Sequence, residues 1–293
     1  MSGAHPSAAE QELLRALRAT RKYGRVHPGV LGRVARRSLA TRGRRDALKA
    51  AKRSLHELAG AFLDADSSRR AERLVRSMAD AGAEERRTVC RAVLGLHASS
   101  AERMPVMEEL YERIWQAAAD ARGVPRSAPV RLLDLACGLG PFALPWMGLA
   151  PGSSYRGVDA DGRVVDLART ALPYLEAPEL REPPEVEAGD VLEPAAALGG
   201  IDVVVMLKTL PTLERLAPGA GVDLVRRLTA PVVVITTATG SLGGRRHLRH
   251  DELIERTLAD SGRQAARFEV AGESVAVAWP AGHDLVTSAR KPA

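Results

Sequence analysis

Acidic side chains stand at the ends of three short apolar segments of this chain. Asp134 opens the run Asp-Leu-Ala-Cys-Gly-Leu-Gly-Pro, Asp159 comes 21 residues after Gly138, and Asp190 follows the third segment. Gly138 and Gly140 lack a Cβ atom, so the chain can turn sharply there and its backbone can approach a ligand closely. An acid at the end of a second strand is placed to accept hydrogen bonds from ribose hydroxyls. The pattern predicts a ligand that contains a nucleoside.

Dinucleotide dehydrogenases also have a Gly-x-Gly and a distal acid, but the neighbouring residues favour a different cofactor. The third glycine of the dinucleotide motif is absent, because position 143 is Ala and Pro141 intervenes. Three carboxylates suit a cofactor with a cationic centre, an amino group and an adenosine, whereas they would repel the pyrophosphate of NAD. The residues therefore favour S-adenosyl-L-methionine. For Asp190, capping of a loop or helix is the alternative role.

Short apolar segments alternating with helical patterns must position these acids. We predict strands over Val130–Ala136, Tyr155–Val158, Val186–Ala188, Ile201–Leu207, Val232–Thr236 and Val275–Trp279. Runs of this length are typical of a parallel sheet covered by helices on both faces, in which ligands bind at the carboxyl ends of the strands. We therefore predict a doubly wound α/β domain over residues 106–293, with Lys208 and Thr209 at the rim of its crevice.

The first 105 residues show helical spacing and no strand pattern. Helices are predicted over 10–21, over 31–62 with a break near Gly43, over 67–81 and over 84–96, with a longer one over 101–121. A turn-rich connection is expected at Tyr23–Gly32, because it contains Pro28 and Gly29. Residues 1–105 are thus expected to form an all-helical N-terminal domain.

The charge of the chain is concentrated in this helical region. The net charge is +6, but residues 1–105 hold 22 Lys+Arg against 11 Asp+Glu, and the segment 15–53 holds 14 basic residues and one acidic residue. A solvated face or a loose tail is the alternative, yet the cations are interleaved with apolar residues at helical spacing. A folded basic face of this density favours a polyanionic partner, and RNA first.

Other features limit the functional class. The two cysteines do not form a CxxC pair, and no His/Cys cluster has metal-ligand spacing, so neither a disulfide framework nor a metal site is expected. No apolar run of the length of a membrane span and no secretion signal is present, which favours the cytoplasm.

Five segments in order resemble one known family. They are 97–103 (His-Ala-Ser-Ser-Ala-Glu-Arg), 134–142, 145–147 (Pro-Trp-Met), 207–214 (Leu-Lys-Thr-Leu-Pro-Thr-Leu-Glu) and 241–245 (Ser-Leu-Gly-Gly-Arg). The chain resembles, over residues 90–250, the aminoglycoside-resistance 16S rRNA methyltransferases that modify N7 of guanine 1405. The resemblance implies a class I S-adenosylmethionine-dependent methyltransferase fold, with a Rossmann-like sheet, behind a helical domain that docks on the 30S subunit.

The resemblance also assigns site residues by motif position. The implied cofactor-binding residues are His97, Ala98, Ser99, Ser100, Ala101, Glu102, Arg103, Ala136, Gly138, Asp159, Asp190, Val191, Leu207 and Leu216, with Arg103 pairing with the cofactor carboxylate. Together with the basic region, the expected substrate-binding residues are Lys208, Arg21, Lys22, Arg36, Arg37 and Arg245. The chain departs from the family at Gly140, Thr212 and Gly240, where Asn, Cys and a basic residue are common.

The implied chemistry requires positioning of the reactants and no general base. Guanine N7 has an exposed lone pair and attacks without first losing a proton, so no catalytic acid or base is nominated. The target base must leave its stack, and Tyr111, Phe142 and Trp146 are the aromatic candidates to hold it, with a core role as the alternative for Trp146. The expected partner is 16S rRNA within the 30S subunit, and the expected oligomeric state is a monomer.

Four other functions are also compatible with the sequence. They are a methyltransferase of adenine N1 in the same rRNA region, a methyltransferase of a small molecule, a non-catalytic RNA-binding relic and a nicotinamide dehydrogenase. The basic N-terminal region speaks against the small-molecule enzyme, and the Lys208–Glu214 motif against the adenine enzyme. Retention of all three acids speaks against the relic, and the broken glycine pattern against the dehydrogenase.

Overall fold

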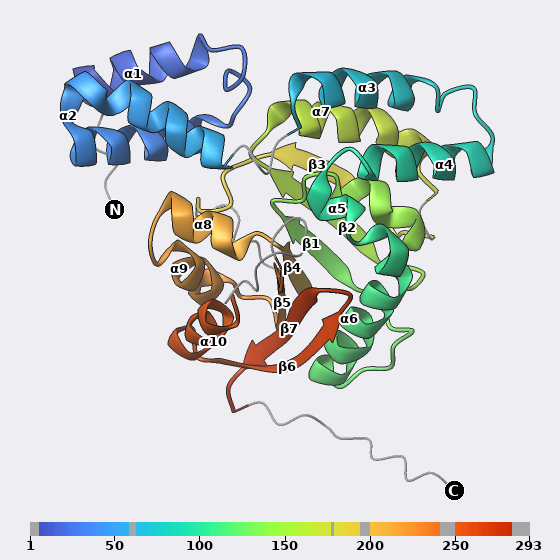
Figure 1. Ribbon diagram of the computed structural model, residues 1–293. Coiled ribbons are helices and arrows are strands. Elements are labelled where there is room, and N and C mark those ends of the chain that lie inside the picture. Colours follow the sequence, from blue (N-terminus) through green and yellow to red (C-terminus); the bar gives the residue numbers. More distant parts are fainter. Residues whose placement is uncertain (1–5, 59–62, 177–178, 194–199, 241–249, 283–293) are drawn as a thin grey trace, which may run out of the picture.

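A seven-stranded sheet forms the centre of the molecule. The computed structural model describes residues 6–58, 63–176, 179–193, 200–240 and 250–282. The strand order is β3-β2-β1-β4-β5-β7-β6 (Figure 1). The strands are β1 (Arg131–Leu135), β2 (Ser154–Asp159), β3 (Glu185–Ala188), β4 (Val203–Leu207), β5 (Val232–Ala238), β6 (Arg263–Val270) and β7 (Glu273–Pro280). The six predicted strands are confirmed, with ends that differ by up to two residues.

The sheet is mixed, whereas the apolar runs predicted only parallel strands. Strands β1 to β5 pair in parallel, but β7 is antiparallel to both β5 and β6. The sequence prediction missed β6 because that strand lies at the edge of the sheet and most of its residues are partly exposed. Ala271 and Gly272 both have positive φ between β6 and β7, as a two-residue hairpin turn requires.

Helices precede the sheet and cover it. They are α1 (Ala8–Arg18), α2 (Pro28–Leu58), α3 (Ala65–Arg76), α4 (Ala83–Leu94), α5 (Ala98–Ala101), η2 (Met104–Val106), α6 (Met107–Arg122), η3 (Gly140–Trp146), α7 (Gly162–Ala171), η4 (Leu172–Tyr174), α8 (Leu210–Leu216), α9 (Ala220–Arg227) and α10 (Asp251–Asp260). In the described part before residue 130, the only β pairing is an isolated bridge from Val26 to Asp161. The helical nature of the N-terminal region is therefore confirmed.

Two predicted boundaries were wrong, and proline explains both. The expected connection Tyr23–Gly32 ends earlier, because α2 begins at Pro28, whose fixed φ and missing N–H suit the first helical position. The helix expected over 101–121 begins only at Met107, since Pro105 lies in the short 3-10 helix η2. None of the helices in the described ranges is both long enough and apolar enough to cross a membrane.

Successive side chains along the strands point into two hydrophobic cores, which lie on opposite faces of the sheet. Leu132, Val203 and Val205 point into a core shared with α3, α4, α6 and α7. Leu133 and Val204 point into the other core, which contains Leu13, Leu17, Leu31 and Leu55 of α1 and α2 together with α8, α9 and α10. Figure 1 shows α1 and α2 side by side, apart from α3 and α4. The N-terminal helices are thus divided between the two cores.

Candidate functional site

A cavity of about 450 Å³ opens at the carboxyl ends of the parallel strands. This volume is typical of a small-molecule site. Its lining comes from four strand ends, from α5, α6 and α8 and from the start of α2, and includes Val30, His97, Ser99, Ser100, Arg103, Tyr111, Asp134, Ala136, Gly138, Asp159, Asp190, Val191, Leu207, Lys208, Thr212, Arg215 and Leu216. The three acids that the sequence singles out therefore share one cavity.

The turn after β1 is held to the end of β2 by a carboxylate. Ala136 and Gly138 have φ of 56° and 52°, a conformation that L residues seldom adopt. The Gly138 N–H donates to Asp159 Oδ2 at 2.8 Å, and the Asp161 N–H donates to Asp159 Oδ1 at 2.8 Å. Burial raises the pKa of Asp159 to about 6. The carboxylate thus fixes the glycine turn at the cavity wall.

Asp134 is the most buried acid of the cavity. Its Oδ2 accepts a hydrogen bond from the Tyr155 hydroxyl at 2.9 Å. A Cβ atom at position 140 would lie 2.6 Å from that oxygen, so Gly140 leaves the space that this carboxyl needs. Burial raises the pKa of Asp134 to about 7, although the Tyr155 hydrogen bond and the charge of Arg103 act in the opposite direction. A buried acid of this kind favours a cationic ligand nearby.

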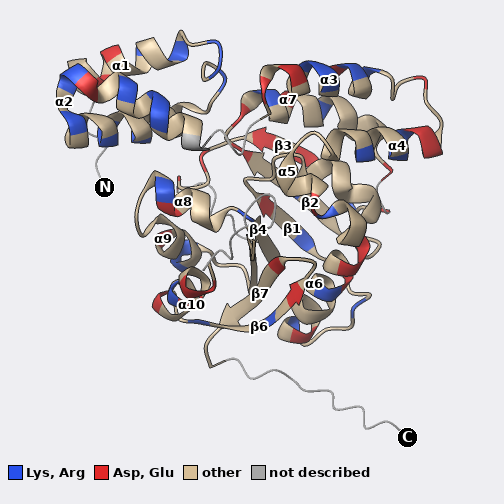
Figure 2. Ribbon diagram, viewed as in Figure 1, with Lys and Arg blue, Asp and Glu red and all other residues tan. Residues whose placement is uncertain are grey.

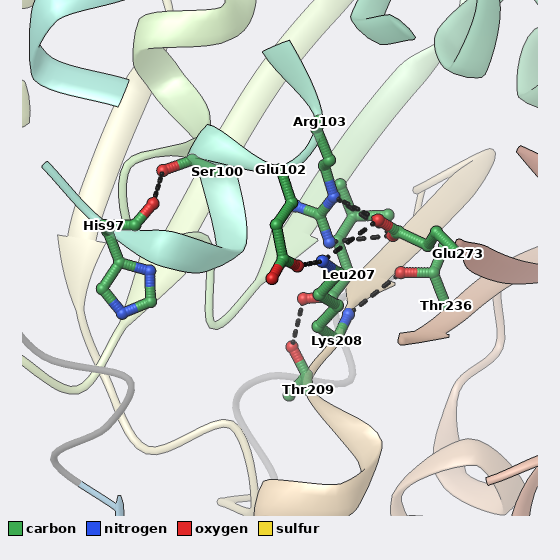
Figure 3. Close-up of polar contacts among 9 residues, drawn as sticks. All are labelled: His97, Ser100, Glu102, Arg103, Leu207, Lys208, Thr209, Thr236 and Glu273. Atoms are coloured by element: carbon green, nitrogen blue, oxygen red, sulfur yellow. Dashed lines mark hydrogen bonds and ion pairs between the residues drawn. The ribbon is translucent and has the colours of Figure 1, made fainter. Parts of the chain in front are cut away.

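Figure 3 shows an ionic network around Arg103, a residue that lines the cavity, and one member of this network, Glu273, was missed by the sequence reasoning. Arg103 donates to both oxygens of Glu273, from Nε at 2.8 Å and from a terminal nitrogen at 2.9 Å. Burial raises the pKa of Glu273, but the charges of Arg103 and Lys208 outweigh burial and hold it below its ordinary value. No motif pointed to Glu273, because the hairpin that carries it comes 170 residues after Arg103.

Lys208 is held by strained backbone and by two acids. Its φ is 57°, and its N–H donates to the Thr236 carbonyl and hydroxyl oxygens at 3.0 Å each. Its Nζ lies 2.6 Å from Glu102 Oε2 and 3.6 Å from Glu273 Oε2 (Figure 3). Strain of this kind persists where the surroundings enforce it, often at functional sites. The amine is consequently fixed at the rim of the cavity.

The segment 97–103 contributes four of its seven residues to the cavity. His97, Ser99, Ser100 and Arg103 line it, whereas Ala98, Ala101 and Glu102 are not among the lining residues. The Ser100 hydroxyl donates to the Leu94 and His97 carbonyl oxygens at 2.6 and 3.0 Å, which secures the one-turn helix α5. Ala136, Gly138, Asp159, Asp190, Val191, Leu207 and Leu216, all predicted at the cofactor, line the cavity.

The predicted RNA-contacting cations of the first helices lie outside the cavity, and three of them have partners within the protein. Arg21 and Lys22 are exposed, and the Lys22 Nζ lies 3.0 Å from His56 Nδ1. Arg36 pairs with Glu10 at 2.8 Å, and Arg37 donates to the carbonyl oxygens of Arg215 and Leu216. Figure 2 shows Lys and Arg along α1 and α2. Arg245 and the rest of the segment 241–245 lie outside the described residues.

Of the three aromatic candidates, only Tyr111 reaches the cavity. Phe142 is fully buried, and Trp146 is buried beneath Arg87 and Arg91, whose guanidinium carbons lie 5.1 Å from its ring centre. The stacking role considered for these two was therefore wrong, because both rings belong to the core. Among the described residues, no group of His, Cys, Asp and Glu side chains could hold a metal ion.

The residues present fit a compact cationic cofactor with a carboxylate. The strand ends supply three carboxylates, and the segment 97–103 supplies Arg103 to the same cavity. Gly138 and Gly140 leave the turn open, and a Cβ at 140 would collide with Asp134. S-adenosyl-L-methionine matches this distribution of charge, whereas the wall of acids disfavours a pyrophosphate.

Comparisons with known proteins agree with this geometry. The family described as Ribosomal RNA methyltransferase (FmrO) matches residues 19–277. A 16S rRNA (guanine(1405)-N(7))-methyltransferase of Micromonospora rosea is 34% identical over 274 residues, which cover 91% of this chain and 95% of the relative. The enzyme of the same name from Micromonospora echinospora is 33% identical over 285 residues, covering 94% of this chain and 99% of the relative.

Solved structures share the whole fold. The 16S rRNA methyltransferase RmtF, in complex with S-adenosyl-L-homocysteine, has a TM-score of 0.71 at 28% identity and covers 94% of this chain and 99% of its own. The 16S rRNA methylase RmtB has the same TM-score at 21% identity, with 94% and 100% covered, and supports the fold alone. The helical N-terminal region is thus part of the shared architecture.

Proposed function

Because the chain belongs to the ribosomal RNA methyltransferase (FmrO) family, we propose that it transfers a methyl group from S-adenosyl-L-methionine to N7 of guanine 1405 in 16S rRNA. The observation that carries this proposal is the single cavity that joins Asp134, Asp159 and Asp190 with Arg103. Relatives named for this reaction align over more than nine-tenths of the chain.

We infer a separate role for each of the polar side chains at the cavity. Asp159 accepts hydrogen bonds from the ribose, Asp190 faces the adenine side, and Arg103 binds the carboxylate of the cofactor. When bound, the cofactor supplies an electrophilic methyl group on a sulfonium. Lys208, fixed at the rim by Glu102, contacts the target nucleotide. Tyr111 is the one candidate aromatic side chain at the cavity.

Catalysis in this proposal rests on positioning. Guanine N7 is already nucleophilic, so the protein has no proton to remove and must only present N7 in line with the methyl–sulfur bond. Orientation of this kind lowers a barrier by roughly 7–11 kcal/mol at best. Extraction of the base from its stack costs a few kcal/mol. Binding of the surrounding RNA by the basic region offsets that cost.

The wider assignments follow from the same proposal. We propose that residues 1–105 dock on the assembled 30S subunit, that residues 106–293 catalyse, and that the protein acts as a monomer in the cytoplasm. N7 methylation adds a positive charge and blocks an acceptor, so a cationic aminoglycoside that binds this site meets electrostatic and steric opposition. Aminoglycoside resistance is the expected consequence.

Transfer from labelled S-adenosyl-L-methionine to purified 30S subunits tests the function. The modified nucleotide is mapped by reduction and strand cleavage, which are specific for N7-methylguanine. Cleavage at guanine 1405 is the expected result. Label in the rRNA without that cleavage would redirect the assignment to another base, with adenine N1 the first alternative, and label in a small molecule alone would remove rRNA from the proposal.

A further inference from the structure

The start of helix α2 closes one side of the cofactor cavity. The His27 N–H donates to the Ala160 carbonyl at 2.7 Å, and the Gly162 N–H donates to the Arg25 carbonyl at 2.9 Å. Ala160 belongs to the wall of the cavity, as does Val30 in the first turn of α2. Backbone contacts therefore attach the proposed docking helices directly to the loop after β2.

A side-chain contact links the same helix to the acid after β3. Arg33 donates to Asp190 Oδ2 at 2.7 Å, and the Leu192 N–H donates to Asp190 Oδ1 at 3.0 Å. The Asp190 side chain is 1% exposed and that of Arg33 is 29% exposed. Each carboxylate oxygen of Asp190 thus has a donor, and one of these donors comes from the N-terminal region. Without Arg33 the carboxylate would be a buried charge with one neutral donor.

A second arginine of α2 reaches the cavity wall from the next turn. Arg37 donates to the carbonyl oxygens of Arg215 and Leu216 at 2.7 and 2.6 Å. These carbonyls end helix α8, where a cation interacts favourably with the unpaired acceptors and with the helix dipole. Leu216 lines the cavity. Arg33 and Arg37 are four residues apart, so the same face of α2 contacts two walls of the cofactor site.

We propose that Arg33 is a positioning residue for the cofactor, acting through Asp190, and that this contact couples rRNA docking on α1 and α2 to cofactor affinity. Arg33 fixes the orientation of the carboxylate that faces the adenosine. A ligand that holds Asp190 in place also stabilises the contact between Arg33 of α2 and Asp190. Because such coupling is reciprocal, RNA that holds α2 in this position raises the affinity for the cofactor. The identities of RNA and cofactor rest on the proposed function.

The first test measures binding of S-adenosyl-L-homocysteine by calorimetry, without substrate. Arg33→Met should raise Kd at least tenfold, and Arg33→Lys should recover part of the loss because it keeps the charge. Arg131→Met is the control. Arg131 pairs with Asp202 at 2.9 Å at the amino end of β1, and neither residue lines the cavity. Equal Kd values for Arg33→Met and Arg131→Met overturn the positioning role.

Ligand truncation locates the effect. 5′-Methylthioadenosine keeps the adenosine and lacks the amino-acid end. Arg33→Met should weaken binding of this ligand and of S-adenosyl-L-homocysteine by the same factor. Arg103→Met should weaken only the binding of S-adenosyl-L-homocysteine, because Arg103 is proposed to bind the carboxylate that 5′-methylthioadenosine lacks. A loss in Arg33→Met that is confined to S-adenosyl-L-homocysteine contradicts a role at Asp190, and thermal unfolding of each variant checks that the comparison is made on folded protein.

The coupling is tested by 30S affinity with and without S-adenosyl-L-homocysteine. We expect the ligand to tighten 30S binding of the original chain at least fivefold, and of Arg33→Met less than twofold. Equal factors in the two proteins overturn the coupling. If the original chain binds no 30S subunits, the proposed function fails, while the two ligand-binding comparisons still decide whether Arg33 positions Asp190.

Discussion

At the scale of single residues, acids that line the cavity and the acid behind Arg103 have opposite electrostatic settings. Asp134 and Asp159 have raised pKa values because they are buried, whereas the pKa of Glu273 is held down by Arg103 and Lys208. The first two are therefore poised to gain from a cationic ligand, while Glu273 is already neutralised by the protein. Asp134 and Asp159 are thus left for the ligand, whereas Glu273 orients the protein's own cations.

Glu273→Gln should lower the free energy of unfolding by about 3–5 kcal/mol. The reason is that Arg103, 13% exposed, would lose a partner that is 4% exposed and would remain as a buried charge. Urea denaturation measures the change. Asp223→Asn is the control, since Asp223 and its partner Arg226 are both more than half exposed, and it should cost no more than about 1 kcal/mol. Equal costs for the two variants would contradict the buried-pair argument.

Stability should depend on pH through Asp134. Between the ordinary pKa of 3.8 and the folded value of about 7, this group binds more protons in the folded state than in the unfolded state. Its contribution to the free energy of unfolding is therefore complete below pH 4. That contribution falls by a few kcal/mol as the pH rises to about 7 and is constant above this pH. Urea denaturation across this window should give a shallower fall for Asp134→Asn. Parallel curves for the two proteins would exclude Asp134 as the source.

At the scale of elements, helix α2 combines several roles through its glycines and arginines. Gly43, with φ of 66° and ψ of 177°, interrupts the helix as the sequence predicted. The first half lines the cavity with Val30 and pairs Arg33 with Asp190, and the second half packs Leu55 into the core. The kink therefore lets one element attach to the catalytic part at its start and extend the basic surface beyond it.

Two glycine substitutions in α2 should act in opposite directions. Gly43→Ala should lower the free energy of unfolding by about 1–3 kcal/mol, because only glycine adopts this backbone conformation readily. Gly32→Ala should raise it by about 0.4–1 kcal/mol. A Cβ at Gly32 meets only the Arg36 guanidinium, at an ordinary 3.5 Å. Thermal and urea denaturation report both changes, and a stabilising Gly43→Ala would show that the kink is not needed.

At the scale of the whole molecule, charge and hydrophobic packing divide the N-terminal helices in the same way. The cations of 15–53 lie on α1, α2 and the segment between them, which share a core with α8, α9 and α10. Helices α3 and α4 instead share the core on the other face with α6 and α7. The basic surface therefore has a rigid base on one face of the sheet, next to the cavity that Val30 lines.

Binding to 30S subunits should weaken steeply with salt. Arg21→Ala and Lys22→Ala should each reduce the slope of log K against log salt by up to about one, because each phosphate contact releases about one counterion. Arg131→Ala is the control, since that exposed cation lies at the amino end of β1, away from the cavity. Filter binding over a range of salt concentrations measures the slopes. Affinity that is constant between low and moderate salt would rule out phosphate docking.

Local sequence determined much of this protein. Apolar runs predicted six strands, helical spacing predicted the N-terminal helices, and the acids at 134, 159 and 190 with Gly138 predicted the place of the cavity. Each strand, helix or turn is signalled by residues a few positions apart, so periodicity and turn chemistry reveal it. The strand β6 escaped prediction because an edge strand with partial exposure has no strong apolar pattern.

The tertiary structure alone decided which distant residues meet. Glu273 reaches Arg103 only because the final hairpin pairs with β5, and Arg33 reaches Asp190 only because α2 packs beside the loop after β3. The tertiary structure also showed that Trp146 is a core residue and that Arg37 donates hydrogen bonds to the carbonyl oxygens at the end of α8. The physical reason is that ion pairs between elements depend on how the elements pack, and composition or spacing along the chain carries no record of that arrangement.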